Sequence, residues 1–215
     1  MKSIEEKILL DILKPWEKLN DSLISNLVLN KNSNDFLTNA SNLATAIKHF
    51  PESTLKFKPF DLSKENISYQ IISDLSDSAK HGDLSNPKRQ CDLILTSLVE
   101  KSTDLKYRFL RNQIEIGHAT HGKRDFLECS RDAIFFILAK CRMASDWKAV
   151  IKTSNIEFSS NIELFADRSL QVSLQGWHCR FIQKNESGVY DVVGHEGKFN
   201  ITLNHNWPTS KEKDD

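Results

Sequence analysis

Apolar residues recur every three or four positions through the first third of the chain, and this spacing predicts amphipathic helices. Pro15 lies inside the first apolar stripe and should kink or divide the helix, because proline lacks a backbone N–H and crowds the preceding turn. A second helix should start at Asn34 or Asp35 and stop at Pro51. The first stripe consists of Ile4, Ile8, Ile12, Trp16, Leu19, Leu23 and Leu27.

The same period predicts two further helices before the middle of the chain. The segment 51–62 contains prolines and has no helical period, so we expect a connector there. A third helix should begin between Ser63 and Asn66 and end at Gly82, a residue suited to the left-handed backbone that closes many helices. A fourth helix should cover residues 87–101, with proline in its favoured first position.

The pattern changes near residue 105 and predicts a β-hairpin followed by a helix. The segment 106–118 is rich in aromatic and β-branched residues, and part of it alternates polar with apolar positions. Residues 119–124 have the composition of a turn, and 125–129 would form the returning strand. We therefore expect a hairpin at about 105–127. The strongly apolar segment 130–143 predicts a buried helix after it.

Short alternating runs follow from Asn155 and predict an antiparallel meander of about four to six strands. Ser187 and Gly188 can supply the turn of its clearest hairpin. Helices first and strands last are typical of an α+β fold, here an N-terminal helical bundle, a β-hairpin with a buried helix, and a C-terminal antiparallel sheet. The predicted parts are a mainly helical domain at 1–148, an antiparallel β subdomain at 149–205 and a charged flexible tail at 206–215.

Composition narrows the function classes only a little. The 215 residues are 39% hydrophobic and 27% charged, as in ordinary globular proteins. The 29 basic and 29 acidic residues balance, so no global field draws the chain to nucleic acid or a membrane. The four cysteines lack CxxC spacing, and the start of the chain has neither a signal peptide nor a membrane span, so we predict a cytoplasmic protein with reduced thiols. The seven glycines form no phosphate-binding loop, and we expect no cofactor.

A Lys-His pair ends two of the predicted helices, in "NLATAIKHF" at 42–50 and "DLSDSAKHG" at 74–82. In the second copy the helical period places Asp74, Asp77 and His81 on one face, where the carboxylates favour a charged imidazole. Lys80, His81 and Asp77 are therefore candidate catalytic residues. The alternative is ordinary helix-end chemistry, because basic residues complement the negative end of a helix dipole. The two ends can meet only if the connector between the helices makes them parallel.

The order Arg111, Asn112 and His118 in "RNQIEIGH" resembles the motif of the HEPN superfamily, helical proteins that include ribonucleases of bacterial toxin–antitoxin and anti-phage systems. This resemblance covers only one short segment of the chain. It implies metal-independent cleavage of RNA. Arg111 would hold the phosphate, and His118 would act as the acid–base group.

Basic residues gather on the predicted hairpin, with aromatic residues between them. Such a surface can contact RNA phosphates and offer a ring for base stacking, although a solvated outer face would have the same composition. We predict no metal site, because no second pair with ligand spacing accompanies His118 and His121. The other residues of ligand type, Cys129, His178 and Cys179, do not complete such a pair. The predicted nucleic-acid contacts are Lys106, Arg108, Lys123 and Arg124.

Two function classes follow from these observations. The first is a binding or assembly protein, such as a non-catalytic partner or regulator in a bacterial defence or toxin–antitoxin system. Its partner would be another protein or a second copy of the chain, with RNA contact through the basic hairpin and no membrane association. The alternative is a HEPN-like ribonuclease that uses Arg111 and His118, or the Lys80-His81 helix end.

Overall fold

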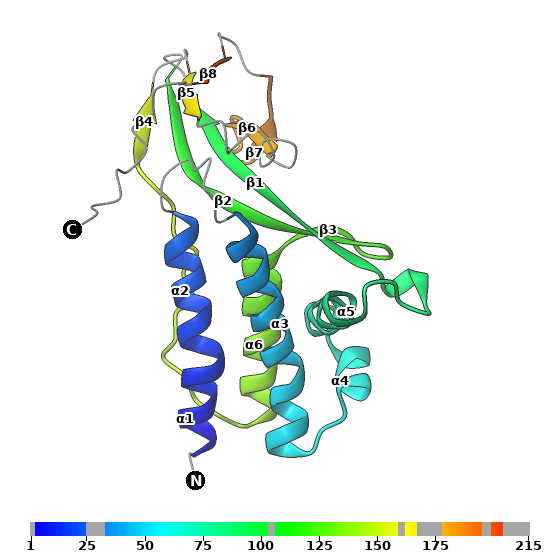
Figure 1. The fold of residues 1–215 in the computed structure, drawn as a ribbon. Helices are drawn as coiled ribbons and strands as arrows, with labels where there is room; N and C mark the ends of the chain where they lie inside the picture. The colour runs from blue at the N-terminus through cyan, green and yellow to red at the C-terminus, as the bar shows by residue number, and fades with distance from the viewer. Residues whose placement is uncertain are drawn as a thin grey trace, which may run out of the picture.

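A layer of helices lies against a mixed β-sheet, which confirms the predicted α+β class (Figure 1). The computed structural model describes residues 3–24, 33–102, 106–158, 162–166, 178–194 and 199–203. In Figure 1, α2, α3 and α6 run side by side, and α5 crosses beside them. The helical elements are α1 (Ile4–Ile8), η1 (Leu9–Leu13), α2 (Lys14–Leu23), α3 (Ser33–Leu55), α4 (Pro59–Glu65), α5 (Ile67–His81) and α6 (Phe126–Lys140).

The helical segment at the start of the chain continues through Pro15 without dividing. The turn before the proline, η1, is wider than an α-helical turn, because the Lys14 N–H bonds to the Leu9 carbonyl, five residues earlier. A wide turn relieves the crowding that a proline ring imposes on the preceding carbonyls. The apolar stripe stays continuous, and both Ile12 and Trp16 are fully buried. Leu27, the last residue of the predicted stripe, lies outside the described residues.

The prediction that Pro51 ends the second helix is wrong, since α3 continues to Leu55. The proline removes one backbone hydrogen bond, to the Ile47 carbonyl, but its ring is buried and gains apolar contact in return. The connector predicted at 51–62 also holds a helix, α4. Pro59 is its first residue, where the missing N–H has no intrahelical partner to lose.

Side-chain caps fix the ends of α5 and the start of α6. The Asn66 Oδ1 atom accepts a first-turn N–H of α5 at 2.8 Å, and Gly82 closes that helix with φ at +70°, as predicted. The Asp125 Oδ1 atom accepts the Glu128 N–H at 3.0 Å, so α6 begins at Phe126. The buried helix predicted after the hairpin is thus confirmed, but it starts earlier and takes over the segment predicted as a returning strand.

Six strands form one sheet in the order β3-β2-β1-β6-β7, with β4 paired to β2. The strand predicted at 106–118 is confirmed by β2, and its antiparallel return is the short β3. Two further strands, β5 and β8, pair only with each other. The strands are β1 (Cys91–Lys101), β2 (Tyr107–His118), β3 (Gly122–Asp125), β4 (Ile156–Phe158), β5 (Ile162–Ala166), β6 (His178–Lys184), β7 (Tyr190–Val192) and β8 (Phe199–Leu203).

The prediction of a helix over residues 87–101 is wrong. The segment opens with a single short turn, η2 (Pro87–Arg89), and continues as β1. A short apolar run fits a helix and a buried strand equally well, so periodicity alone cannot separate them. Pairing with β2 decides the outcome, because the antiparallel ladder runs almost the full length of both strands.

The C-terminal strands are only partly antiparallel. The predicted β6–β7 hairpin is confirmed, with Gly188 in its turn at φ +77°. The expectation of a wholly antiparallel meander is wrong, because β6 runs parallel to β1 and β5 runs parallel to β8. The long crossover through β2, β3 and α6 returns the chain in the direction of β1. Strands β4, β6 and β7 therefore extend the sheet of the hairpin, while the predicted tail at 206–215 lies outside the described residues.

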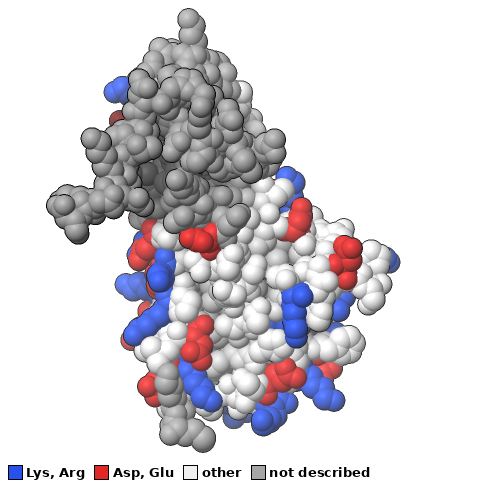
Figure 2. Space-filling view, in the orientation of Figure 1, with Lys and Arg blue, Asp and Glu red and all other residues white. Residues whose placement is uncertain are grey.

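The hydrophobic core lies between the helices and one face of β1 and β2. Ile114 and Ile116 of β2 share a buried cluster with Ile47, Leu75 and Ile134 from α3, α5 and α6. On the face shown in Figure 2, acidic and basic side chains alternate over the helices and form no large field of one sign. Within the described part of the chain, no helix has both the length and the apolar character needed to cross a bilayer.

Candidate functional site

Asp74 of α5 is a buried carboxylate with a donor on each oxygen. Only 3% of its side chain is exposed. The Arg89 Nε atom donates to Oδ1 at 2.6 Å, and the His118 Nε2 atom lies 3.3 Å from Oδ2. Arg89 comes from η2 and His118 from the end of β2, so this one carboxylate joins the helix layer to the sheet.

Asp77, one turn later on α5, is held between two cations. The Arg89 Nη2 atom donates to its Oδ2 atom at 2.7 Å, and Lys48 of α3 forms an ion pair with Oδ1. Burial alone would raise the pKa of Asp77, but the hydrogen bonds and charges of Lys48 and Arg89 outweigh burial and hold the pKa below its ordinary value. We call Lys48, Asp74, Asp77, Arg89 and His118 the α5 charge cluster.

Both ring nitrogens of His118 are engaged. Its Nδ1 atom accepts the backbone N–H of Thr120 at 3.0 Å and that of His121 at 3.2 Å. Nδ1 must therefore be unprotonated, so the proton lies on Nε2 and points at Asp74. A second proton on Nδ1 would face two N–H donors. These contacts make the imidazole a structural link between α5 and the turn after β2.

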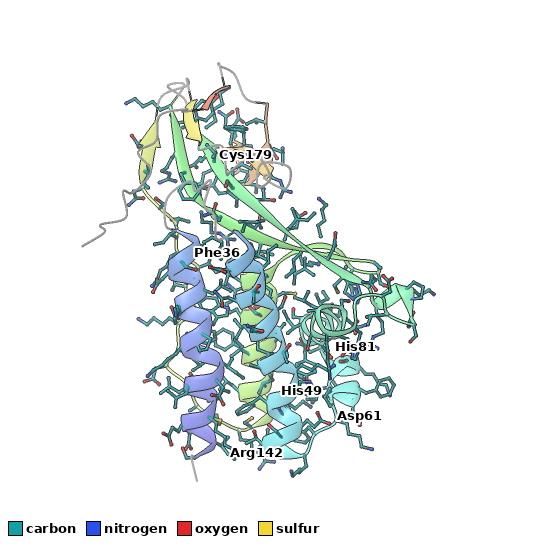
Figure 3. The ribbon with its side chains drawn as sticks, in the orientation of Figure 1. Phe36, His49, Asp61, His81, Arg142 and Cys179 are labelled. Atoms are coloured by element: carbon teal, nitrogen blue, oxygen red, sulfur yellow. The ribbon has the colours of Figure 1, made fainter. Side chains whose placement is uncertain are left out.

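A groove of about 510 Å³ lies beside the α5 charge cluster. The side chains of Asp74 and Asp77 that line it are 3% and 21% exposed, whereas those of Arg89 and Lys64 are 41% and 62% exposed. Phe60 of α4 is 70% exposed at the same groove. Figure 3 shows how the helices around it are placed, with Asp61 labelled on α4 and His81 at the end of α5. The lining residues are Lys48, Pro59, Phe60, Ser63, Lys64, Gln70, Ser73, Asp74, Asp77, Asn86 and Arg89.

The structure joins the two Lys-His helix ends through lysine rather than histidine. Lys48 pairs with Asp77, and Thr45 bonds Ser76 at 3.1 Å, so α3 and α5 do touch at these positions. His49 is exposed and lies 3.1 Å from Glu52 of its own helix. Lys80 and His81 are exposed as well. Among the described residues His81 has no bond to Asp77, and the three predicted catalytic residues of this helix end form no joint site.

A second polar cluster covers the face of the sheet that points away from the helix core. Arg111 and Gln113 of β2 both donate to the Asp125 Oδ2 atom. Glu115 accepts from Lys123 at 2.7 Å and from Arg180 at 2.8 Å. The Arg111 Nη1 atom is buried and has no hydrogen-bond partner. We call Arg111, Gln113, Glu115, Lys123, Asp125 and Arg180 the sheet-face cluster.

Arg111 and His118, which carry the HEPN resemblance, lie on opposite faces of β2. They are seven residues apart on a strand, where side chains alternate between faces, and the register between them is regular. Their partners differ accordingly: Arg111 binds Asp125 and His118 binds Asp74. In the HEPN superfamily the motif lies on a helix. The resemblance stays a prediction, and this geometry gives the pair no common site.

The basic hairpin is partly neutralised. Arg108 binds Glu100 with Nε at 2.9 Å, and Lys123 binds Glu115, while Lys106 and Arg124 are exposed. The expected stacking aromatics are not accessible, because Tyr107 and Phe109 are fully buried. Tyr107 instead packs edge-on against Phe181, with ring centroids 5.5 Å apart. β2 is buried on both faces, which an alternating pattern alone does not reveal.

The cysteines and histidines gather at no metal centre within the described ranges, where no group of three or more His, Cys, Asp or Glu could hold an ion. The cysteines are free. Burial raises the pKa of Cys91 to about 12 and that of Cys129 to about 11, so both thiols are protonated and poorly nucleophilic.

Sequence patterns only partly indicate the roles of three residues that line the groove. Lys48 belongs to the Lys-His repeat, but the histidine beside it is the more obvious candidate for catalysis. Arg89 lies in a segment predicted as helix, which hides its place at a turn before a strand. Phe60 follows a proline in the connector, and only the structure shows it exposed at a groove.

Comparisons with family models, curated proteins and solved structures find no match to the chain. Its function must therefore be inferred from the arrangement of its own residues.

Proposed function

We propose that this chain is a binding protein, and that the groove beside the α5 charge cluster takes an oxyanion of its ligand. One observation carries the proposal: Arg89 and Lys64 line an open groove with 41% and 62% of their side chains exposed, while each oxygen of the two carboxylates beside them already accepts from a donor. Asp74 and Asp77 thus hold Arg89 in place, and 3% and 21% of their own side chains are exposed. A cation held in place before binding loses less side-chain entropy when an anion arrives.

Some hydrogen-bond donors that line the groove are not used by the carboxylates of the α5 charge cluster. A guanidinium group carries five N–H bonds, and Arg89 uses its Nε and Nη2 atoms on the two acids, which leaves Nη1. Lys64 is mostly solvated, and its nearest carboxylate oxygen, on Asp61, is 3.9 Å away. Charge-assisted hydrogen bonds from such groups to carboxylate or phosphate are about twice as strong as neutral ones. An oxyanion is therefore the ligand chemistry that suits this wall best.

Binding agrees better than catalysis with the state of the titratable groups. Asp74 has a donor on each oxygen and His118 has a partner on each ring nitrogen, and all of these partners belong to the protein, so the contacts of both residues serve the fold. The HEPN-like ribonuclease remains the alternative, and loss of labelled single-stranded RNA cleavage in an Arg111→Gln variant would favour it. A protein partner or second copy, a cytoplasmic location and a role in bacterial defence remain predictions.

Calorimetric titration of the full chain with pyrophosphate at low salt tests the proposal. Lys64→Gln should weaken binding several-fold and Arg89→Gln about tenfold, because each removes a charged donor. The matched controls are Lys152→Gln and Arg108→Gln, which remove a lysine and an arginine from ion pairs outside the groove. Circular dichroism confirms that each variant is folded. Binding that is absent in the unchanged chain, or equally weakened by the controls, would overturn the proposal.

A further inference from the structure

Phe60 is the most exposed large aromatic residue that the groove contains. It lies at the start of α4 with 70% of its surface in solvent. The Lys64 Nζ atom sits 3.9 Å from the centre of its ring, so a cation covers one ring face. The exposure of the rest of the side chain leaves the other face accessible. This ring is therefore available for stacking by a ligand that enters the groove.

We infer that the groove binds a nucleotide unit, with its phosphate on Arg89 and Lys64 and its base stacked on Phe60. This inference rests on the proposed function, since it names the class of oxyanion that the groove takes. A nucleotide joins the two chemistries that the groove offers: a phosphate for fixed cations and a flat π-system for an open aromatic face. Simple carboxylates and inorganic phosphate would leave Phe60 unused.

The dimensions and lining of the groove suit such a ligand. Its volume of about 510 Å³ lies within the range of small-molecule sites. The cation wall and the aromatic ring come from different elements, Arg89 from η2 and Phe60 from α4, so a ligand must span the groove to reach both. Gln70 and Asn86 also line the groove, and their amide side chains offer donors and acceptors for a base edge or a ribose hydroxyl.

A nucleotide unit has two sources, a free mononucleotide and single-stranded RNA. Both present the same phosphate and base, so one set of variants serves for both. Titrations of the full chain with AMP, with a short labelled RNA oligomer and with pyrophosphate separate the two sources from each other and from a plain anion. Phe57→Ala is the matched control, because Phe57 is an exposed phenylalanine that does not line the groove.

Phe60→Ala should weaken AMP or RNA binding on the order of tenfold and pyrophosphate binding much less, whereas Phe57→Ala should change neither. Phe60→Trp should restore or strengthen nucleotide binding, because the larger ring stacks better. AMP binding as tight as that of the oligomer identifies the free nucleotide as the source, and tighter oligomer binding identifies RNA; either result supports the inference.

The failures can be told apart. If pyrophosphate binds but neither AMP nor RNA responds to Phe60→Ala, the inference is overturned while the proposed anion site stands. If no phosphate compound binds, the proposed function fails together with it. If Phe60→Ala abolishes association with a protein and leaves nucleotide affinity unchanged, the ring serves a protein interface and the inference is wrong.

Discussion

The α5 charge cluster and the sheet-face cluster contain the same kinds of charged group but differ in how those groups are paired. Each pairs two carboxylates with cations. In the α5 charge cluster every oxygen of Asp74 and Asp77 has a donor, and the partners come from α3, η2 and β2. In the sheet-face cluster three cations surround two acids, and the Arg111 Nη1 atom remains buried without a partner.

The difference shows what each cluster contributes to the fold. The contacts of Asp74 connect segments that the core alone would hold only through apolar packing, so its hydrogen bonds fix how α5 sits on the sheet. The sheet-face contacts link neighbours of one sheet, whose arrangement the backbone ladders already determine. The first cluster should therefore contribute more to stability than the second.

Removing Asp74 should have the largest effect. Asp74→Ala leaves the His118 Nε2–H without its acceptor and frees Arg89, so we expect a loss of about 3 kcal/mol in the free energy of unfolding. Asp74→Asn keeps one acceptor and should recover part of this loss. Urea denaturation measures both. Asp61→Ala is the control, because that carboxylate is exposed and should cost less than about 0.5 kcal/mol; equal losses at the two positions would refute the argument.

Removing Arg111 should cost less, although this side chain is also buried. In Arg111→Met the Asp125 carboxylate keeps the Gln113 amide at 2.7 Å and the Glu128 N–H at 3.0 Å, and the orphaned Nη1 atom disappears. We expect a loss of roughly 1–2 kcal/mol in the same denaturation assay. A loss as large as that of Asp74→Ala would mean that the two clusters do not differ as described.

Acid should weaken both clusters in one pH window. At Glu115, as at Asp77, burial alone would raise the pKa, but hydrogen bonds from Lys123 and Arg180 outweigh it and lower the pKa. A carboxylate with a lowered pKa stabilises the folded state above its unfolded pKa of roughly 4, and this contribution is lost as the pH falls through the lower folded value.

The stability difference between the unchanged chain and Asp77→Asn should therefore be constant above about pH 5 and shrink as the pH falls from about 5 toward about 3. Glu115→Gln should behave in the same way. Denaturant midpoints across this range measure the effect, with Asp61→Asn as the flat control. A difference that stays constant into the acid range would show that the lowered pKa of Asp77 contributes nothing to stability.

Lys123 should matter least. Its side chain is 67% exposed, and Glu115 keeps Arg180 at 2.8 Å when the lysine is gone. Lys123→Ala should change the free energy of unfolding by no more than about 0.5 kcal/mol, because solvent screens an exposed ion pair. Thermal unfolding would reveal a larger effect, and a loss above about 1 kcal/mol would mean that the sheet-face cluster acts as one unit.

The predicted fold was right where local signals determine the structure. Asn66 and Gly82 mark the ends of α5 through capping chemistry, and the composition of 106–118 suits a strand. It was wrong where distant contacts decide. Residues 87–101 become a strand because β2 pairs with them, and β6 runs parallel to β1 because of a long crossover. No local pattern encodes either pairing.

The candidate site was predictable in its acids and, through a different motif, in His118. The helical period placed Asp74 and Asp77 near each other, which the structure bears out, but it assigned them His81 as a partner. Their partners Lys48, Arg89 and His118 come from three other elements, so tertiary packing selects them. Seven-residue spacing aligns side chains on a helix and opposes them on a strand, which explains why Arg111 and His118 are apart.

The parallel ladder between β1 and β6 has a consequence for the order of folding. β1 is an inner strand, and one of its two neighbours is made only after β2, β3, α6 and β4 have left the ribosome. Until then β1 presents an unpaired edge, the kind of surface on which nascent chains associate wrongly. Pairs this far apart in sequence also slow folding. A chain that stops before His178 should fold its helical layer and hairpin, yet keep that edge open and aggregate.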